Sequence, residues 1–144
     1  MRTETEKSLA LVDSNILVYA FAEDSPKHKT ALKLLKQCFS GNITLAISLQ
    51  NIGEFCNIAL WKYKLDLHLV KQIVKQIVYC SSLRKISYTT NEFEIALELA
   101  GKQNMEFWDT MLAATMIEND VKTIYTEDAA FGKIEGIKVV NPFQ

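Results

Sequence analysis

The amino-acid sequence predicts an α/β domain of three layers, in which helices cover both faces of a central, mainly parallel sheet of about five strands. Short apolar runs rich in β-branched residues alternate with longer amphipathic segments, the pattern of a parallel α/β fold. The chain has 144 residues, of which 49% are hydrophobic and 23% charged, enough for one full core. With only two prolines, five glycines and no low-complexity sequence, there is little material for a linker. Residues 1–144 are therefore expected to form a single domain.

The five expected strands are short runs of apolar residues that end at polar ones. They cover residues 9–12, 44–48, 85–88, 122–126 and 137–140. The first is the most informative, because Leu-Ala-Leu-Val is followed directly by Asp13 and then by a helix-compatible segment. Ligands of parallel α/β sheets bind beyond the carboxyl ends of the strands, so Asp13 is expected at the edge where chemistry usually occurs.

The helices are predicted from apolar residues that recur with a period of 3.6. They cover residues 16–21, 27–39, 49–63, 66–83, 91–100 and 106–119. Residues 23–26 before the second of these are expected to be a turn or a helix start, in which Ser25 can cap and Pro26 suits the first helical position. Ser48 is expected to cap the third helix, and Gly101 to end the fifth.

Several classes of protein are excluded by what the sequence lacks. Cys38, Cys56 and Cys80 are odd in number and widely spaced, which argues against a disulfide framework and a zinc site. His28 and His68 have no partner at metal-ligand or triad spacing. The polar N-terminus is not a signal peptide, and no apolar run approaches the roughly 18 to 20 residues that span a bilayer. We therefore expect a cytoplasmic protein without a membrane partner.

Charge is unevenly distributed, although the net charge is only −1. Residues 1–85 hold 12 Lys and Arg against 7 Asp and Glu, whereas residues 86–144 hold 4 against 10. Such asymmetry favours either a basic surface for a polyanion beside an acidic site, or two solvated faces that differ in charge.

Four carboxylates stand out from the pattern. Asp13 and Asp128 follow buried strands, Glu54 lies on the flank of an apolar helix, and Asp109 lies in the first turns of another. Each has a purely structural interpretation: a helix cap for Asp13, a turn for Asp128, a helix-dipole partner for Asp109 and an edge residue for Glu54. Glu54 fits its structural interpretation least well, because no basic residue lies one helical turn away.

Together these four residues, here called the acidic quartet, would repel one another or protonate unless a cation neutralised them. Oxygen ligands without Cys or His favour Mg²⁺ or Mn²⁺ over zinc. Because Mg²⁺ commonly retains water and binds substrate phosphates, such a site suits phosphodiester hydrolysis, with one or two ions.

Four motifs in order then resemble the PIN-domain nucleases, most closely the VapC-type ribonuclease toxins of toxin–antitoxin pairs. They are Val-Asp-Ser-Asn-Ile-Leu-Val-Tyr at 12–19, Ser-Leu-Gln-Asn-Ile-Gly-Glu-Phe at 48–55, Phe-Trp-Asp-Thr-Met-Leu-Ala-Ala at 107–114 and Tyr-Thr-Glu-Asp-Ala-Ala-Phe at 125–131. The resemblance covers nearly the whole chain.

The resemblance implies a Mg²⁺- or Mn²⁺-dependent endoribonuclease with the acidic quartet as catalytic and metal-binding residues. It also implies supporting roles for Asn15 and Thr126, and makes Glu127 a candidate additional ligand. Family members commonly form homodimers and are silenced by an antitoxin protein that occupies the acidic groove. RNA is thus the expected substrate, and an antitoxin and a second copy are the expected partners.

Three alternatives remain open at this point. The same family contains RNA-processing nucleases that are not toxins, and a non-catalytic RNA- or protein-binding module could retain the fold. A phosphoacceptor domain would need acidic partners adjacent to its nucleophilic Asp and a Lys near the last strands. Here Asp13 is followed by Ser14 and Asn15, and the last strand offers only Lys138. No Gly-rich phosphate loop is present, which disfavours nucleotide cofactors.

Overall fold

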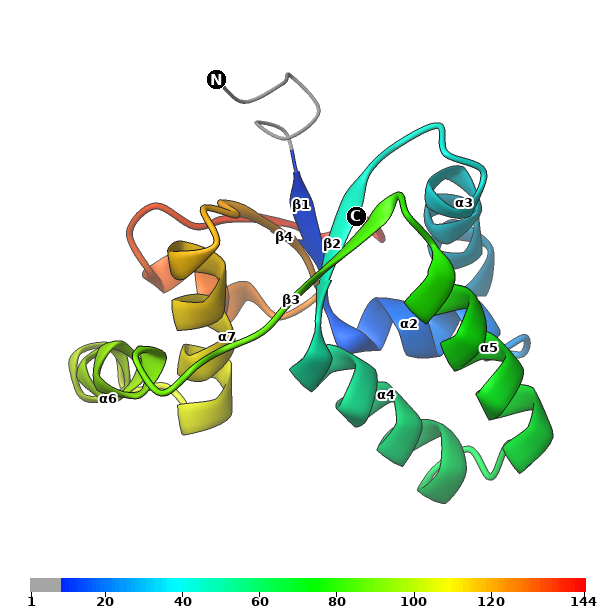
Figure 1. The fold of residues 1–144 in the computed structure, drawn as a ribbon, viewed down its shortest axis with the longest axis horizontal. Coiled ribbons are helices and arrows are strands. Elements are labelled where there is room, and N and C mark those ends of the chain that lie inside the picture. Colours follow the sequence, from blue (N-terminus) through cyan, green and yellow to red (C-terminus); the bar gives the residue numbers. More distant parts are fainter. Residues whose placement is uncertain (1–8) are drawn as a thin grey trace.

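The computed structural model describes residues 9–144, and within them five strands form one parallel sheet (Figure 1). The strands are β1 (Ala10–Val12), β2 (Leu45–Ser48), β3 (Leu83–Ile86), β4 (Thr123–Tyr125) and β5 (Lys138–Val140). Their order across the sheet is β3-β2-β1-β4-β5, and every neighbouring pair is parallel. The predicted fold class is confirmed.

Helices cover both faces of this sheet. They are α2 (Ser14–Phe21), α3 (His28–Phe39), α4 (Leu49–Trp61), α5 (Leu67–Tyr79), α6 (Glu92–Gln103), α7 (Phe107–Glu118) and the 3₁₀ helix η1 (Ala129–Lys133). In Figure 1, α2 to α5 lie on one side of the sheet and α6 and α7 on the other. A hydrophobic core lies on each face of the sheet, and alternate residues of β1 point into the two cores. Ala10 and Val12 pack with α2 to α5, and Leu11 packs with α7 and η1.

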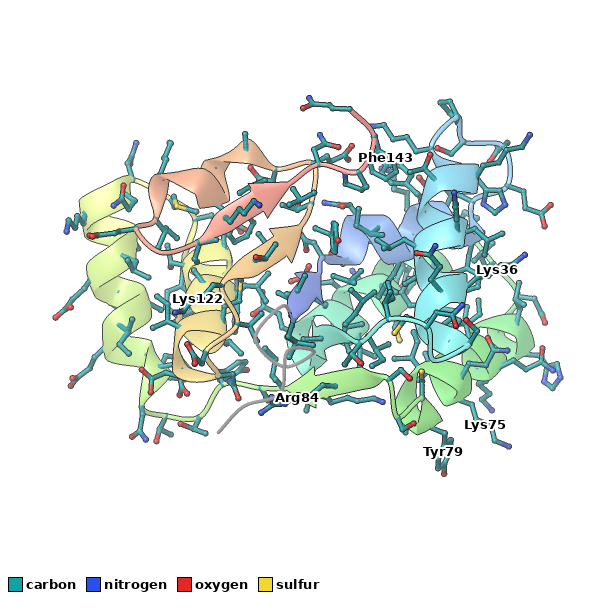
Figure 2. All side chains as sticks on the ribbon, turned by 90° about the horizontal axis from the view of Figure 1, so that it is seen from above. Lys36, Lys75, Tyr79, Arg84, Lys122 and Phe143 are labelled. Carbon is teal, nitrogen blue, oxygen red and sulfur yellow. The ribbon has the colours of Figure 1, made fainter. Side chains whose placement is uncertain are left out.

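The uneven charge of the sequence corresponds to these two helical layers. Figure 2 shows Lys36 of α3 and Lys75 of α5 at the end of the molecule that the first layer forms. On the opposite layer, α6 carries the exposed acidic residues Glu94 and Glu98. The basic and acidic halves of the chain therefore become two different faces of the protein.

Of the two interpretations of residues 23–26, the turn is the one that the structure shows: helix α3 begins at His28, and Ser25 Oγ accepts from the Lys27 N–H at 3.2 Å. Two other local predictions are wrong. Helix α6 continues through Gly101 and ends before Asn104, which is left-handed with φ of 53°. Gly101 has open space around it, and a helix interior tolerates such a glycine at about 1 kcal/mol while Asn104 takes the terminating conformation.

The second wrong prediction concerns the helix expected at 66–83, which ends at Tyr79. Strand β3 consequently begins at Leu83, two residues before the predicted position. This register places Leu83 in the core of α2 to α5 and Ile86 in the opposite core. The sequence also gave no indication of η1.

The connections place the carboxyl ends of β1 and β4 at the topological switch point of the sheet. From β1 the chain moves to β2 on one side, whereas β4 pairs with β1 on the other side and leads to β5. Crevices at such points are the usual ligand sites of parallel α/β sheets. The backbone N–H of Asp13 donates to the Tyr125 carbonyl at 3.1 Å, which joins the two strand ends.

Other expectations concern cysteines and membranes. The three cysteines are free; Cys38 is buried, and burial raises the pKa of its thiol to about 11. Among residues 9–144, no helix is both long and apolar enough to cross a bilayer. The expectation that the N-terminal segment is not a signal peptide concerns residues 1–8, which lie outside the described residues.

Candidate functional site: an acidic site at the switch point

Asp13 caps helix α2 and is also held by side chains from distant elements. Its Oδ1 accepts the backbone N–H of Ser14 at 2.7 Å, which confirms the capping geometry. The same oxygen accepts from Asn51 Nδ2 of α4 at 3.2 Å, and Oδ2 accepts from Thr126 Oγ1 at 2.8 Å. The side chain is buried, and this set of donors fixes its orientation.

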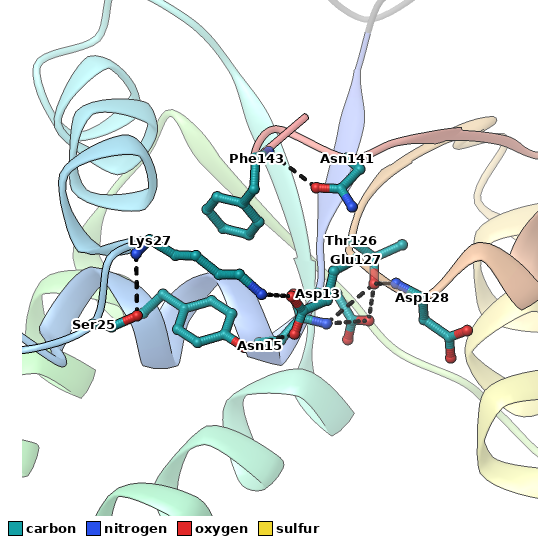
Figure 3. Close-up of polar contacts among 10 residues, drawn as sticks. Asp13, Asn15, Ser25, Lys27, Thr126, Glu127, Asp128, Asn141 and Phe143 are labelled. Carbon is teal, nitrogen blue, oxygen red and sulfur yellow. Dashed lines mark hydrogen bonds and ion pairs between the residues drawn. The ribbon is translucent and has the colours of Figure 1, made fainter.

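Thr126 connects the ends of β1 and β4. Its buried hydroxyl donates to Asp13 and accepts from Asn15 Nδ2 and from the backbone N–H of Asp128, each at 3.1 Å. Figure 3 shows Thr126, Glu127 and Asp128 as successive residues whose side chains diverge, with Thr126 facing Asp13. Asn15 and Thr126, the two residues expected to support the site, thus contact Asp13 and each other.

Glu54 reaches the site from α4. Its Oε2 accepts from Ser14 Oγ at 2.9 Å, and its Oε1 accepts from Gln50 Nε2 at 2.9 Å. The start of α4 is fixed by a capping box between Ser48 and Asn51, so the predicted cap is confirmed. Asn51 therefore performs two tasks, because its amide also donates to Asp13.

Asp109 and Asp128 complete the acidic quartet from the opposite side. Asp109 lies in the first turn of α7, and Asp128 caps η1 by accepting from Ala130 N–H at 3.0 Å. The pKa of Asp109 is raised from 3.8 to about 6. The cause is burial first, and then the negative charges of Asp128, Glu106, Asp13 and Glu54.

The pKa of Asp13 is raised in the same way. Burial outweighs the hydrogen bonds from Thr126 and Ser14, and the charges of Glu54 and Asp128 add to it. Within residues 9–144, the ion pairs are Lys27–Glu127 and Lys122–Asp120, so no described cation neutralises the acidic quartet. The four carboxylates thus form one electrostatically coupled and uncompensated group.

Glu127 faces away from this group. It pairs with Lys27 Nζ and accepts from Tyr19 Oη at 2.7 Å (Figure 3). Burial alone would raise its pKa, but Lys27 and Tyr19 together lower it. Lys27 also lies 5.0 Å from the ring centroid of Tyr19 and 5.5 Å from that of Phe143. To bind a metal, Glu127 would have to give up these partners.

The donor chemistry of the acidic quartet fits a hard divalent cation, because all of its ligands are oxygen and its charge is uncompensated. In the part of the chain that the structure describes, no three His, Cys, Asp or Glu side chains are grouped closely enough to hold an ion together. Mg²⁺ is commonly bound by one or two carboxylates, with water and substrate phosphates as its other ligands. The residues therefore fit such an ion without forming a complete protein cage.

Three residues that contact the acidic quartet were not predicted from the sequence: Ser14, Gln50 and Asn51. Ser14 and Gln50 bind Glu54, and Asn51 binds Asp13. Two of them left a local signal: Asn51 lies three positions after the capping Ser48, and Gln50 lies one helical turn before Glu54 in α4. The contact of Ser14 with Glu54 depends on how α4 packs beside α2.

The fold and site define an α/β domain with an acidic site at the carboxyl-terminal edge of a parallel sheet. The chain belongs to the PIN-domain family, whose sequence model matches residues 10–137. This confirms the resemblance that the four motifs indicated. No curated protein sequence matches the chain.

Solved structures show the same fold. A toxin–antitoxin complex from Klebsiella pneumoniae is 22% identical with a TM-score of 0.64, covering 92% of this chain and 97% of that one. VapC20 of Mycobacterium tuberculosis, described as a toxin that cleaves the sarcin–ricin loop, is 19% identical with a TM-score of 0.68, covering 88% and 94%. VapBC2 of Rickettsia felis, bound to DNA from its promoter, is 21% identical with a TM-score of 0.61, covering 92% and 98%.

Proposed function

We propose that this protein is a Mg²⁺- or Mn²⁺-dependent endoribonuclease that hydrolyses RNA phosphodiester bonds, and that it is the toxin of a toxin–antitoxin pair. The observation that carries the proposal is the acidic quartet: four coupled carboxylates at the switch point, two with raised pKa values, and no described cation paired with them. Membership of the PIN-domain family supports the nuclease activity.

In this proposal Asp13, Glu54, Asp109 and Asp128 would hold the metal, either directly or through its water ligands. When bound, the ion would lower the pKa of a water ligand and balance charge on the phosphate. Asp13 is oriented by Thr126 and Asn51, so its free lone pairs face a fixed direction. Glu54 is oriented by Ser14 and Gln50.

Asn15 and Thr126 act as positioning residues. Each reaches Asp13, and their mutual hydrogen bond fixes the end of β4 against the start of α2. Glu127 is proposed as an additional ligand only when Lys27 releases it. Lys27 is half-exposed, so a substrate phosphate could draw it away.

The proposed partners follow from the structural neighbours. Toxin–antitoxin assemblies from Klebsiella pneumoniae and Rickettsia felis share the fold, and VapC20 is described as a toxin that cleaves the sarcin–ricin loop. They support an antitoxin partner. We further propose that the antitoxin covers the acidic site, that the protein forms a homodimer and that it acts in the cytoplasm.

RNA cleavage tests the activity directly. With a mixed RNA substrate, we expect cleavage with Mg²⁺ or Mn²⁺ and none in EDTA. Asp13→Asn should reduce the rate by about 100-fold or more, because a bound metal lowers the activation barrier by several kcal/mol and the variant loses a proposed ligand. Asp66→Asn is the matched control: this Asp lies at the start of α5, and its side chain caps nothing. Cleavage that persists in EDTA, or in Asp13→Asn, would contradict the proposal.

The toxin role is tested separately. Expression should arrest bacterial growth, Asp13→Asn should not, and co-expression of the protein encoded beside this gene should restore growth. Cleavage without growth arrest would instead indicate an RNA-processing nuclease. Calorimetry that detects no Mg²⁺ or Mn²⁺ binding, with tight RNA binding, would indicate the non-catalytic module.

A further inference from the structure

A cavity of about 720 Å³ adjoins the acidic quartet. It lies where the start of α4, the segment after β3 and the first turn of α7 meet. Glu54 and Asp109 form part of its wall, so it opens onto the site described above. The rest of its lining is Leu49, Gln50, Ser87, Tyr88, Glu106 and Trp108. A cavity of this volume accommodates a ligand the size of a nucleotide.

One wall of the cavity is aromatic and rigidly supported. Trp108 is 45% exposed although its indole is large and apolar. Its ring meets Tyr88 at 6.0 Å, tilted by 52°, and Phe107 edge-on at 5.2 Å. Phe93 packs on both of these supports, at 5.8 Å from Tyr88 and 6.0 Å from Phe107. This cluster fixes the indole while leaving a planar surface uncovered, as a stacking platform for a base requires.

Gln50 supplies an unsatisfied acceptor in the same lining. Its Nε2 donates to Glu54 Oε1 at 2.9 Å and to the Trp108 carbonyl at 3.0 Å. Because both partners are acceptors, the orientation of the amide is fixed. Its Oε1 is buried and receives no hydrogen bond from any described residue. Because this oxygen is buried, the acceptors that a ligand in the cavity can reach are the carboxylates of the lining, those of Glu54, Glu106 and Asp109.

The charge of the cavity selects the part of a nucleotide that would enter. The carboxylates of Glu54, Glu106 and Asp109 line it, so a phosphate would be repelled. The N–H donors on the edge of a base would instead be attracted. The reaction proposed above already brings an RNA chain to this edge of the sheet, which favours a base over a cationic side chain of a protein.

We propose that this cavity is a base subsite: a base with an exocyclic amine stacks on Trp108 and donates to the carboxylates that line the cavity, while a neighbouring phosphate lies at the acidic quartet. The inference rests on the proposed function and adds substrate preference to it. Adenine, cytosine and guanine carry an exocyclic amine. The one donor on the pairing edge of uracil, N3–H, lies between two carbonyl oxygens, which the carboxylates lining the cavity would repel. Cleavage is therefore expected beside an amino-bearing base more often than beside uracil.

The fluorescence of Trp108 can report binding at the cavity, because the chain has only two tryptophans. Trp61→Phe removes the other one, which lies 75% exposed at the end of α4. Titrated in EDTA, this variant should show saturable fluorescence quenching by AMP and CMP, weaker quenching by UMP and none by ribose 5-phosphate. The matched control, Trp108→Phe, retains Trp61 and should not respond. Quenching that does not depend on the base, or no quenching, would overturn the proposal.

Kinetics give a second, independent measurement. Trp108→Ala should raise KM for RNA by about fivefold or more with a smaller change in kcat, and Trp108→Phe should recover part of this loss. The backbone carbonyl that holds Gln50 survives both substitutions. An unchanged KM, or quenching by a basic peptide but not by nucleotides, would contradict a base subsite. If nucleotides quench the fluorescence of the wild-type protein but the protein cleaves no RNA, the proposed function is wrong and the base subsite is retained.

Discussion

Replacing Asp109 by Asn should stabilise the metal-free protein at neutral pH. Burial and neighbouring carboxylates raise the pKa of Asp109 from 3.8 to about 6, so the ionised form is disfavoured in the folded state. At 1.36 kcal/mol per unit of pKa, the upper bound of this penalty is about 3 kcal/mol. Because the side chain is only partly buried, solvent screening reduces the expected gain to about 1 kcal/mol. A neutral amide of the same shape removes the penalty.

The pH dependence identifies the cause. The folded-state pKa lies above the unfolded value, so the contribution of Asp109 to stability is fully present below about pH 4 and is lost as pH rises through about 6. The free energies of unfolding of Asp109→Asn and wild type should therefore diverge over this range. Urea unfolding in EDTA at several pH values measures the difference, and thermal unfolding should show a shift of about 3 °C at neutral pH.

A surface carboxylate provides the control. Glu135 is exposed in the turn before β5, and Glu135→Gln should leave the pH profile unchanged. The reasoning is refuted if Asp109→Asn is less stable than wild type at neutral pH, or if the gap is constant from acid to neutral pH. Adding Mg²⁺ should stabilise the wild type more than the variant, because the variant loses a proposed ligand.

Two further substitutions test the contacts around the site. Thr126→Val removes the hydroxyl that donates to Asp13, so the free energy of unfolding should fall by about 1 to 3 kcal/mol and RNA cleavage by about tenfold or more. Thr90→Val, at an exposed position, is the control for urea unfolding, and equal stability of the two variants would contradict this. Lys27→Met should raise the pKa of Glu127, which loses its ion pair but keeps its burial. NMR titration of the Glu127 carboxyl carbon measures this, and an unchanged midpoint would refute the role assigned to Lys27.

Local signals explain why much of the fold and part of the site were predictable. The capping role of Asp13 could be predicted because an apolar run precedes it and a helix follows it directly. Ser48 lies in the same sequence pattern. Parallel strands bring their carboxyl ends to one edge, so the common location of Asp13 and Asp128 also followed. The catalytic and metal-binding roles of these residues remain predictions.

Contacts between distant segments could not be predicted. Ser14 and Glu54 are 40 residues apart, and Gln50 and Trp108 are 58 apart. Their hydrogen bonds depend on how helices pack across the sheet edge, which no short pattern encodes. The incorrect helix end at Gly101 has a related cause: a helix held by its neighbour α7 can include a residue of weak propensity.

The pairing of β1 with β4 determines when the acidic quartet can assemble. Thr126 follows Asp13 by 113 residues, and the backbone of Asp13 is bound to Tyr125. A ribosome makes the N-terminal strand first, so a nascent chain that ends before these residues carries Asp13 without its partners from β4 and lacks Asp128. If the proposed function is correct, the nuclease would stay inactive beside the ribosome until its synthesis was nearly complete.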